Sequence, residues 1–405
     1  MKIQDVFVKE IFDSRGESTI EVGLNPSTSS GQKGLGDWQK AQIPSGKSRG
    51  KREAAVLPYG EAAEVLEEII KPTLIGKDFN SIKEFDDFFI RLDGTPHKER
   101  LGGNLILGLS LAFSRALGAA RGQELWEIVR QEFFSETKNA PLPRIFANLI
   151  NGGQHAKNNL DIQEYMVVTN GIDVKTIFEK LKKFYADLGE FLKKEKSLAE
   201  LPLGDEGGYV LDWSNNFPPL NLLSQKIYEA GLANDWNLAI DVAASGFYEN
   251  DFYNFDGQKI RAVDLSNFYR DYFRQLSLLI SIEDPFAEDD GVNFGKLLAA
   301  EKGKWIVGDD LTATDPAAIE TAFKKKWINA VIIKANQIGT VSETCAAIKD
   351  VHEKKGLAII SHRSGETDDC FLIHLAKASG AGGVKIGAPV RERLLKYNEL
   401  VRLYS

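Results

Sequence analysis

The sequence predicts an α/β protein in which a smaller α+β N-terminal domain precedes a C-terminal (β/α)8-type barrel. Three observations support this prediction. The chain has 405 residues, more than one ordinary domain needs and suitable for two. Its first third has the pattern of strands followed by helices, whereas from about residue 144 short apolar runs alternate with helical segments. Six of these runs end in a polar residue, and those residues are 42, 26, 25, 28 and 23 positions apart.

The N-terminal domain is predicted to span residues 1–136. Apolar and polar residues alternate at 20–24, as on a half-buried strand. Residues 61–70 place their apolar side chains on one helical face, and this helix is expected to stop at Pro72. Residues 104–130 form a long apolar helical stretch rich in Ala and Leu. Strands followed by helices are typical of an α+β domain.

The barrel domain is predicted to span residues 137–405. The boundary is expected near 136–141, where the polar segment SETKNA is followed by two prolines. Residues 177–192 then place six apolar side chains on one face of a helix. One strand, one helix and two loops fit each of the spacings between the polar residues, and the first spacing leaves room for an insertion. Chemistry spread over six strands favours a barrel over an open sheet, because only in a barrel do the strands converge.

The polar residues at the ends of the six apolar runs are the first candidates for an active site. In a barrel of this type, active-site residues lie at the carboxyl ends of the strands. One polar residue at a strand end means little, but six in succession are expected to meet. They are Asp241, Glu283, Asp309, Lys334, His362 and Lys385.

Asp241, Glu283 and Asp309 predict a metal site. Three carboxylates cannot share a dry pocket unless a cation neutralises them. An all-oxygen ligand set suits Mg²⁺, whereas zinc sites usually contain His or Cys. The alternative, that each acid merely caps a helix, is less suited to three acids on consecutive strand ends. The neighbouring Asp284 and Asp310 are expected either to cap a helix or to support the ligands from behind.

Lys334 would be a buried lysine close to that cation. Burial and a nearby positive charge both lower the pKa of a lysine, which would let Lys334 act as a general base. The ammonium group of Lys385 would add to this effect and could also bind a substrate carboxylate.

Three polar segments complete the candidate site. SHRSGE at 361–366 offers an arginine fork and hydroxyl groups directly after a strand, which suits a phosphate. GDEGG holds Glu206 between glycines, and the segment 151–165 contains His155 and Glu164. Glu164 and Glu206 could act together in general-acid catalysis, with one of them protonated because the other is close. These residues indicate metal-assisted proton abstraction from a carboxylated and phosphorylated small molecule.

Net charge indicates which kinds of partner to expect, and cysteine content indicates the cellular compartment. The formal net charge is −8, which argues against a nucleic-acid partner or an anionic membrane surface. Cys345 and Cys370 form no CxxC motif, so a reducing cytoplasm is expected. The N-terminus lacks the apolar core of a signal peptide, and no run reaches the length of a membrane span.

The motifs resemble those of the enolase family along nearly the whole chain. IIKANQIG and SHRSGET are highly specific, because other members of the superfamily share the barrel but not these strings. The motifs are DSRG at 13–16, LDGTP at 92–96, NGGQH at 151–155, QEYM at 163–166, GDEGG at 204–208, DVAAS at 241–245, SIEDPFAEDD at 281–290, GDDLTAT at 308–314, IIKANQIGTVSET at 332–344, SHRSGET at 361–367 and KIGAP at 385–389.

The resemblance implies a lyase, the phosphopyruvate hydratase of glycolysis and gluconeogenesis, which reversibly dehydrates 2-phosphoglycerate to phosphoenolpyruvate. Asp241, Glu283 and Asp309 would hold a first Mg²⁺. A second Mg²⁺ would arrive with the substrate and bridge its phosphate to the loop that carries Ser48. A cytoplasmic homodimer or higher homo-oligomer is implied as well.

The resemblance also implies a role for each candidate residue. Lys334 would take the C2 proton, and Glu206, with Glu164 and a water nearby, would protonate the departing hydroxide. Lys385 and the metal ions would stabilise the doubly charged carboxylate of the intermediate. The substrate would be bound by Ser48, His155, Gln163, His362, Arg363, Ser364 and Lys385.

Two other readings remain open at this point. A non-catalytic protein that keeps the fold would be expected to lose the base, the acid or the ligands, and this sequence keeps all of them. A racemase or ammonia lyase of the same superfamily would not need the SHRSGE segment or His155. Several positions depart from the family. SGKSRG at 45–50 stands where SGASTG is usual, so Lys47 and Arg49 replace small residues, and Gly246 stands where the family usually has Glu.

Overall fold

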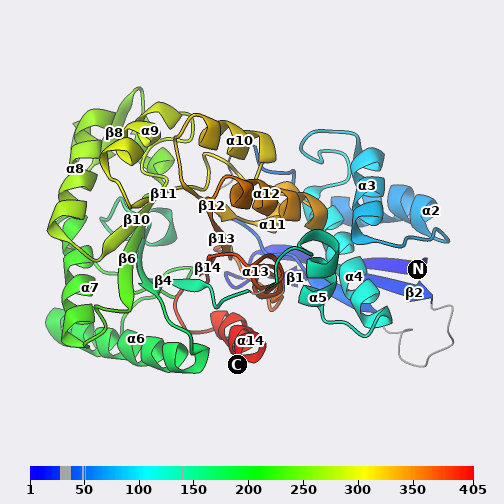
Figure 1. Ribbon diagram of the computed structural model, residues 1–405, viewed down its shortest axis with the longest axis horizontal. Helices are drawn as coiled ribbons and strands as arrows, with labels where there is room; N and C mark the ends of the chain where they lie inside the picture. Colours follow the sequence, from blue (N-terminus) through cyan, green and yellow to red (C-terminus); the bar gives the residue numbers. More distant parts are fainter. Residues whose placement is uncertain (28–37, 48–49, 51, 139) are drawn as a thin grey trace.

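The structure of the chain is a computed structural model that describes residues 1–27, 38–47, 50, 52–138 and 140–405. Figure 1 shows two parts side by side, an N-terminal part coloured blue to cyan and a larger part coloured green to red. The first part contains an antiparallel sheet with helices, and the second contains a closed eight-stranded barrel. The predicted fold class is therefore confirmed.

A three-stranded antiparallel sheet and the helices beside it form the N-terminal part. Its main elements are β1 (Lys2–Phe12), β2 (Ser18–Ser27), β3 (Gln39–Gln42), α3 (Ile82–Asp93), α4 (Gly103–Ala120) and α5 (Leu125–Phe133). Alternate residues of β2 face the core, so Ile20, Val22 and Leu24 are buried, as the sequence predicted. Helix α4 approaches this face so closely that a Cβ atom on Gly108 would clash with Val22.

The first helical segment runs further than the sequence predicted. Helix α1 (Tyr59–Val65) continues through a π-helical turn (Leu66–Ile70) into α2 (Lys71–Leu74), so the helix passes Pro72 instead of stopping there. The prediction was wrong because the turn before the proline closes a hydrogen bond over five residues. This wider turn accommodates a ring that would clash with the carbonyl of an ordinary α-helix.

The apolar stretch at 104–130 is two helices, α4 and α5. The chain turns between them at Gly122, which has a φ of 65°, and Glu124 and Glu127 form a capping box at the start of α5. Within the described residues, α4 is the one helix long and apolar enough to cross a membrane by length and composition. However, 83% of that stretch is buried inside the protein, as in the core helix of a globular fold.

Eight strands close the barrel, and six of them carry a predicted site residue at or directly after their carboxyl end. The strands are β4 (Arg144–Asn151), β5 (Glu164–Thr169), β6 (Trp236–Asp241), β10 (Leu279–Glu283), β11 (Trp305–Gly308), β12 (Ala330–Ile333), β13 (Leu357–Ser361) and β14 (Gly383–Lys385). They pair in that order, and β14 pairs with β4 to close the ring. Side chains of the strand interiors are almost entirely apolar and buried.

Helices surround the barrel on the outside (Figure 1). The predicted helix at 177–192 lies within α6 and is confirmed. The helices are α6 (Val174–Lys196), α7 (Phe217–Glu229), α8 (Ala262–Gln275), α9 (Gly291–Ala300), α10 (Pro316–Lys324), α11 (Ala335–Ile338), α12 (Val341–Glu353), α13 (Phe371–Ser379) and α14 (Arg393–Tyr404). The wide spacing after Asp241 holds a small separate sheet, made of β7 (Tyr248–Glu249), β8 (Phe252–Phe255) and β9 (Gln258–Ile260).

The second strand of the barrel runs against the other seven. β5 is antiparallel to both β4 and β6, while the remaining neighbours are parallel. The connection from Asn151 to Glu164 holds only a short 3-10 turn (Gly153–His155), whereas a parallel crossover usually needs a whole helix. The strict alternation of strand and helix expected from residue 144 onward is therefore wrong for this first pair. The reversal places the start of β5 beside the carboxyl ends of its neighbours, where Glu164 pairs with Asp241.

Candidate active site

Most of the side chains singled out in the sequence surround one cavity at the carboxyl end of the barrel. The cavity has a volume of about 30 Å³, room for about two water molecules. Glu283 lies next to the lining and contacts Lys385, whereas Ser48 and Arg49 lie outside the described residues. The predicted site residues in the lining are His155, Gln163, Glu164, Glu206, Asp241, Asp309, Lys334, His362, Arg363, Ser364 and Lys385.

Asp241, Glu283 and Asp309 form a cluster of buried carboxylates. One oxygen from each lies within 4.8 Å of the others, and all three side chains are almost completely buried. The register of the parallel strands places Glu283 level with Asp241. Asp284 supports the cluster from behind, because its carboxylate accepts the backbone N–H groups of Asp309 at 2.9 Å and Asp310 at 2.7 Å. Of the two roles expected for Asp284, these contacts fit support of the ligands and not a helix cap.

Lys385 bridges the carboxylates on the barrel axis. Its Nζ atom donates to Glu283 Oε1 at 2.8 Å and Asp241 Oδ2 at 3.0 Å, and it lies 3.2 Å from Glu164 Oε2. Burial alone would lower the pKa of Lys385, but Asp241 and then Glu164 raise it well above its usual value. Burial and the charge of Asp241 raise the pKa of Glu283 even though Lys385 opposes this effect. The cluster therefore holds more negative charge than one lysine balances.

Lys334 follows β12 directly and contacts the carboxylate of Asp309. Its backbone N–H donates to Thr314 Oγ1 at 2.9 Å, which fixes the start of the side chain. Burial alone would lower the pKa of Lys334, as the sequence predicted, but the carboxylate of Asp309 raises it above the usual value. The low pKa expected beside a bound cation stays a prediction. In the ion pair with Asp309, the carboxylate outweighs burial and the positive charges of Arg363 and Lys385.

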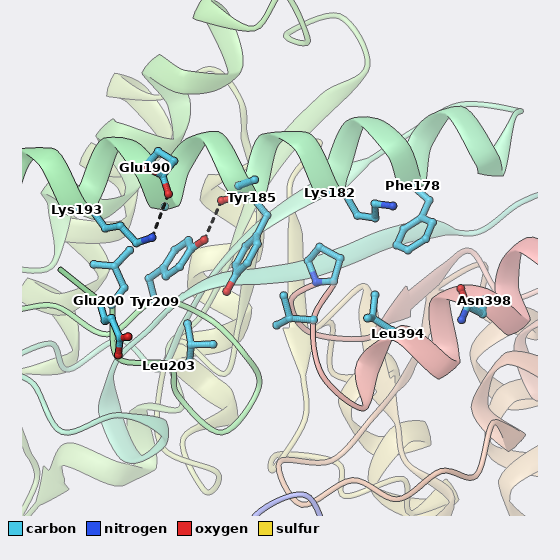
Figure 2. A pocket seen from close by; sticks show the side chains of 15 residues that line it. Phe178, Lys182, Tyr185, Glu190, Lys193, Glu200, Leu203, Tyr209, Leu394 and Asn398 are labelled. Atoms are coloured by element: carbon cyan, nitrogen blue, oxygen red, sulfur yellow. Dashed lines mark hydrogen bonds and ion pairs between the residues drawn. The ribbon is translucent and has the colours of Figure 1, made fainter. Parts of the chain in front are cut away.

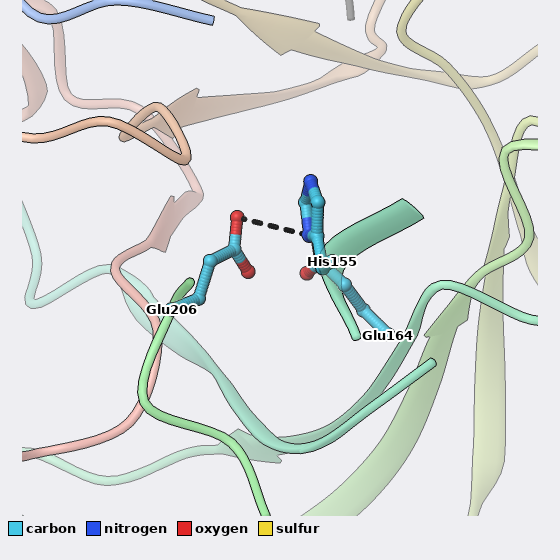
Figure 3. Close-up of side chains that lie close together, drawn as sticks. All are labelled: His155, Glu164 and Glu206. Atoms are coloured by element: carbon cyan, nitrogen blue, oxygen red, sulfur yellow. Dashed lines mark ion pairs between the residues drawn. The ribbon is translucent and has the colours of Figure 1, made fainter. Parts of the chain in front are cut away.

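Figure 3 shows the acid pair, in which Glu164 and Glu206 approach the same imidazole. His155 Nδ1 lies 3.6 Å from Glu206 Oε1 and 3.7 Å from Glu164 Oε1. Burial and the neighbouring Glu206 raise the pKa of Glu164 well above its usual value. Burial opposes ionisation of Glu206 as well, but His362, His155 and Lys385 lower its pKa below the usual value. Glu164 therefore holds a proton more tightly than Glu206 does.

The two histidines of the site are neutral near pH 7. Burial lowers the pKa of His155 below its usual value and that of His362 well below, although the charge of Glu206 opposes this effect in both. His362 Nε2 lies 3.4 Å from Glu206 Oε1, and Asn148 Nδ2 donates to Glu206 Oε2 at 2.9 Å. Asn148 on β4 and His362 directly after β13 thus approach the two oxygens of Glu206.

Arg363 and Ser364 lie at the rim of the cavity, on the segment after β13. The guanidinium group of Arg363 donates to Glu53 Oε2 and to Asn336 Oδ1, both at 3.1 Å. Ser364 Oγ accepts the backbone N–H of Lys47 at 3.0 Å, and the Lys47 ammonium lies 3.0 Å from Asp205 Oδ2. The N-terminal part therefore reaches across the mouth of the barrel.

Several residues of the site had no strand-end signal in the sequence. Glu53 comes from the N-terminal part and binds Arg363, and Gln337 on α11 donates to Asp309 Oδ1 at 3.3 Å. Gln337 lies in the motif IIKANQIG, so that motif could have identified it, whereas no pattern pointed to Glu53. Asn148 faces Glu206 from the interior of β4, and strand alternation alone could not separate it from a core residue.

A larger hollow lies outside this site, between α6 and α14 (Figure 2). It has a volume of about 800 Å³. Tyr185 and Tyr209 stack on its wall with ring centres 4.5 Å apart, and Tyr209 donates its hydroxyl to the carbonyl of Tyr185. Tyr185 in turn donates to the carbonyl of Gly207 at 2.6 Å, so this wall supports the GDEGG loop from behind.

The fold and the site define a barrel enzyme with acid–base groups beside a carboxylate-rich candidate metal centre. A family model described as "Enolase, C-terminal TIM barrel domain" matches residues 139–405, and one described as "Enolase, N-terminal domain" matches residues 3–129. The chain belongs to the enolase family. The resemblance seen in the motifs and the predicted enzyme class, a lyase of the phosphopyruvate hydratase type, are thereby confirmed.

Curated relatives match the chain over almost its whole length. The enolase of Elusimicrobium minutum (strain Pei191) is 37% identical over 415 residues, which cover 99% of this chain and 95% of the relative. The enolase of Methanopyrus kandleri is 38% identical over 421 residues, with the same coverage of both chains. Enolase 1 of Entamoeba histolytica is 38% identical over 430 residues, covering 100% of this chain and 96% of the relative. The family implies a metal, and the buried carboxylates are candidates to hold it.

Proposed function

We propose that this chain catalyses the reversible dehydration of 2-phosphoglycerate to phosphoenolpyruvate. The observation that carries the proposal is that one cavity brings together a lysine, a pair of carboxyl groups, a carboxylate cluster and an arginine with a serine. In the forward reaction C2 loses a proton and C3 loses hydroxide, and a double bond forms between the two carbons. The proton released to the protein and the proton given to hydroxide balance, so the products are phosphoenolpyruvate and water.

Asp241, Glu283 and Asp309 fit a divalent cation. Their oxygens are close enough to share one ion, no nitrogen or sulfur ligand stands among them, and their mutual repulsion raises the pKa of Glu283. We propose Mg²⁺ at these residues and a second Mg²⁺ that arrives with the substrate near Ser48. Bound there, the metal supplies positive charge that stabilises the substrate carboxylate as it gains charge.

Lys334 is the proposed base. Its contact with Asp309 keeps the amine protonated when nothing else neutralises that carboxylate. Once Asp309 serves as a ligand, less negative charge remains to hold the proton, and burial then favours the neutral amine that can accept a proton from C2. Lys385 keeps its ammonium charge among the carboxylates and would stabilise the substrate carboxylate from the other side.

Glu164 and Glu206 are the proposed acid pair. Because the pKa of Glu164 is raised and that of Glu206 is lowered, Glu164 is better suited to hold a proton, and Glu206 can orient a water molecule. Together they can deliver the proton that the departing hydroxide needs. His155 contacts both carboxyl groups and would keep this proton oriented.

The phosphate end of the substrate is assigned to the rim. Arg363 and Ser364 offer a planar fork and a hydroxyl group next to the cavity. Gln163, His155 and His362 would contact the rest of the substrate, and Ser48 would close over it. We also propose a cytoplasmic homodimer, and a domain boundary between residues 136 and 137, in the segment that joins α5 to β4.

Turnover tests the proposal directly. The ultraviolet absorbance of phosphoenolpyruvate should rise when the chain meets 2-phosphoglycerate and Mg²⁺, and it should stop rising when a chelator removes the metal. The matched control is Lys326→Ala, which removes an exposed lysine from the opposite end of the barrel. No product at saturating Mg²⁺ would refute the proposal.

A further inference from the structure

Helix α14 carries two fully buried cations, Arg393 and Lys396, outside the lining of the candidate site. They stand one turn apart and face the loops behind the cavity. Taking a charge out of water is costly unless its partners compensate, so each buried cation needs an explanation.

Lys396 has an ordinary partner. Its ammonium lies 2.8 Å from Glu366 Oε2 and also contacts the carbonyl of Thr367. The Glu366 carboxylate accepts the backbone N–H of Arg363 at 3.0 Å. In the part of the chain that the structure describes, the ion pair and hydrogen bond of Lys396 both go to the proposed phosphate-binding segment.

Arg393 makes a different set of contacts. Its Nη2 atom donates to three backbone carbonyls, those of Arg363 and Ser364 at 3.1 Å and that of Asp205 at 3.3 Å. Two of these carbonyls belong to the proposed phosphate-binding segment, and the third directly precedes Glu206. One guanidinium group thus joins the segment that would bind phosphate to the loop that carries the proposed acid.

The rest of the environment supports a positioning role. Within the described residues, the one carboxylate in an ion pair with the guanidinium group is Glu392, with Oε1 at 2.9 Å from Nη1. Gly387 leaves the space that the two loops need, because a Cβ atom there would lie 2.8 Å from the carbonyl of Glu206 and 3.3 Å from Arg393 Nε. A hydrophobic residue at 393 could fill the space, but it could not hold three carbonyls.

We infer that Arg393 is a positioning residue that couples the phosphate-binding segment 361–367 to the acid loop 204–208. The inference rests on the proposed function and deepens it. Arg393 touches no reacting atom and acts through the backbone of Asp205, Arg363 and Ser364. Loss of this link displaces the acid and the phosphate site together, whereas the base Lys334, directly after β12, keeps its place.

The test compares two reactions of 2-phosphoglycerate in the Mg²⁺-loaded protein. Exchange of the C2 proton with solvent needs the base, whereas formation of phosphoenolpyruvate needs the base and the acid. In Arg393→Lys we expect a higher KM and a kcat lowered by about 10- to 100-fold, the scale of a small misplacement of a catalytic group. Proton exchange should fall much less than dehydration does.

Two matched variants separate coupling from general damage. Lys396→Met loosens only the phosphate-binding segment, so KM should rise while exchange and dehydration change by the same factor. Arg130→Lys alters a half-buried guanidinium that also holds backbone carbonyls, those of Ala378 and Lys377, far from the site. It should leave both reactions unchanged.

If Arg393→Lys does not fold, a substitution of the partly exposed Glu392 provides a second test. Glu392→Gln removes the carboxylate beside the guanidinium group, and it should raise the ratio of exchange to dehydration about two- to threefold, a small loss of positioning. Equal losses of exchange and dehydration in the folded variant, or kinetics like those of Arg130→Lys, would overturn the inference. Failure of the proposed function looks different, because the wild-type chain would then show neither reaction.

Discussion

Replacing Asp86 by Asn should make the free energy of unfolding less dependent on pH. Asp86 lies at the contact between the two parts of the chain. Asp86 lies on α3, is fully buried, and accepts the backbone N–H of Ser342 on α12 at 2.8 Å. Burial raises its pKa to about 7 from 3.8, although hydrogen bonds from Ser110 and Ser342 lower it. An asparagine side chain keeps the acceptor and the size but carries no charge.

The direction in which stability changes with pH follows from the difference in proton binding between the folded and unfolded states. Between about pH 3.8 and pH 7 the folded state holds the proton more tightly than the unfolded state, so stability falls as the pH rises. Each pH unit in that window costs about 1.4 kcal/mol, and the loss is complete above pH 7. Between pH 5 and pH 8 the wild-type chain should therefore lose up to about 3 kcal/mol relative to Asp86→Asn.

Urea unfolding at pH 5 and pH 8 measures this difference, with both chains at one concentration so that any assembly contributes equally. The carboxylates of the site titrate in both chains, so the comparison isolates Asp86. Asp87→Asn is the matched control, since Asp87 is the next residue on α3 and pairs at the surface with Lys83. If the midpoints of wild type and Asp86→Asn shift equally with pH, the account of Asp86 is wrong.

Three shorter predictions concern the site. Lys334→Ala should lower kcat by about 100-fold or more while Mg²⁺ binding measured by calorimetry stays close to wild type; near-normal turnover would refute its role as base. Lys385→Met should destabilise the fold by roughly 3–5 kcal/mol, because it leaves buried carboxylates unpaired, and an unchanged unfolding midpoint would contradict this. Gly365→Ala should raise KM in steady-state assays, because its Cβ would lie 2.0 Å from Asp13 Oδ2 and 2.5 Å from Ser45 Oγ; an unchanged KM would show that the loop adapts.

Much of the site could be predicted from the sequence, because the carboxyl ends of parallel barrel strands all lie at the same end of the barrel. Asp241, Glu283 and Lys385 end their strands, and Asp309 and Lys334 follow theirs by one residue. Local residue order is enough to find such positions, since the barrel brings the ends together without any further information.

Some residues reach the site only because of strand direction or contacts between distant parts of the chain. These residues could not be predicted from local sequence. Glu164 begins its strand, and it reaches the site only because β5 runs against its neighbours. Glu53 and Arg393 reach the site from other parts of the fold, and nothing in their local sequence distinguishes them from surface or core charges. The pKa of Lys334 depends on which charges neutralise Asp309, and the order of residues in the sequence does not show this.

The charges around the cavity support the proposed order of binding. Asp241, Glu283 and Asp309 face the ammonium groups of Lys334 and Lys385, and Asp284 and Asp310 add two further carboxyl groups to the same pocket. Burial and the neighbouring carboxylates raise the pKa of Glu283, Asp284 and Asp310, so the two lysines leave part of the repulsion uncompensated. A divalent cation at Asp241, Glu283 and Asp309 would relieve that repulsion. The substrate would then bring a carboxylate and a phosphate into the same pocket, where Arg363 is already paired with Glu53. This further negative charge favours the proposed second cation with the substrate, and we expect a first ion bound alone to be the tighter of the two.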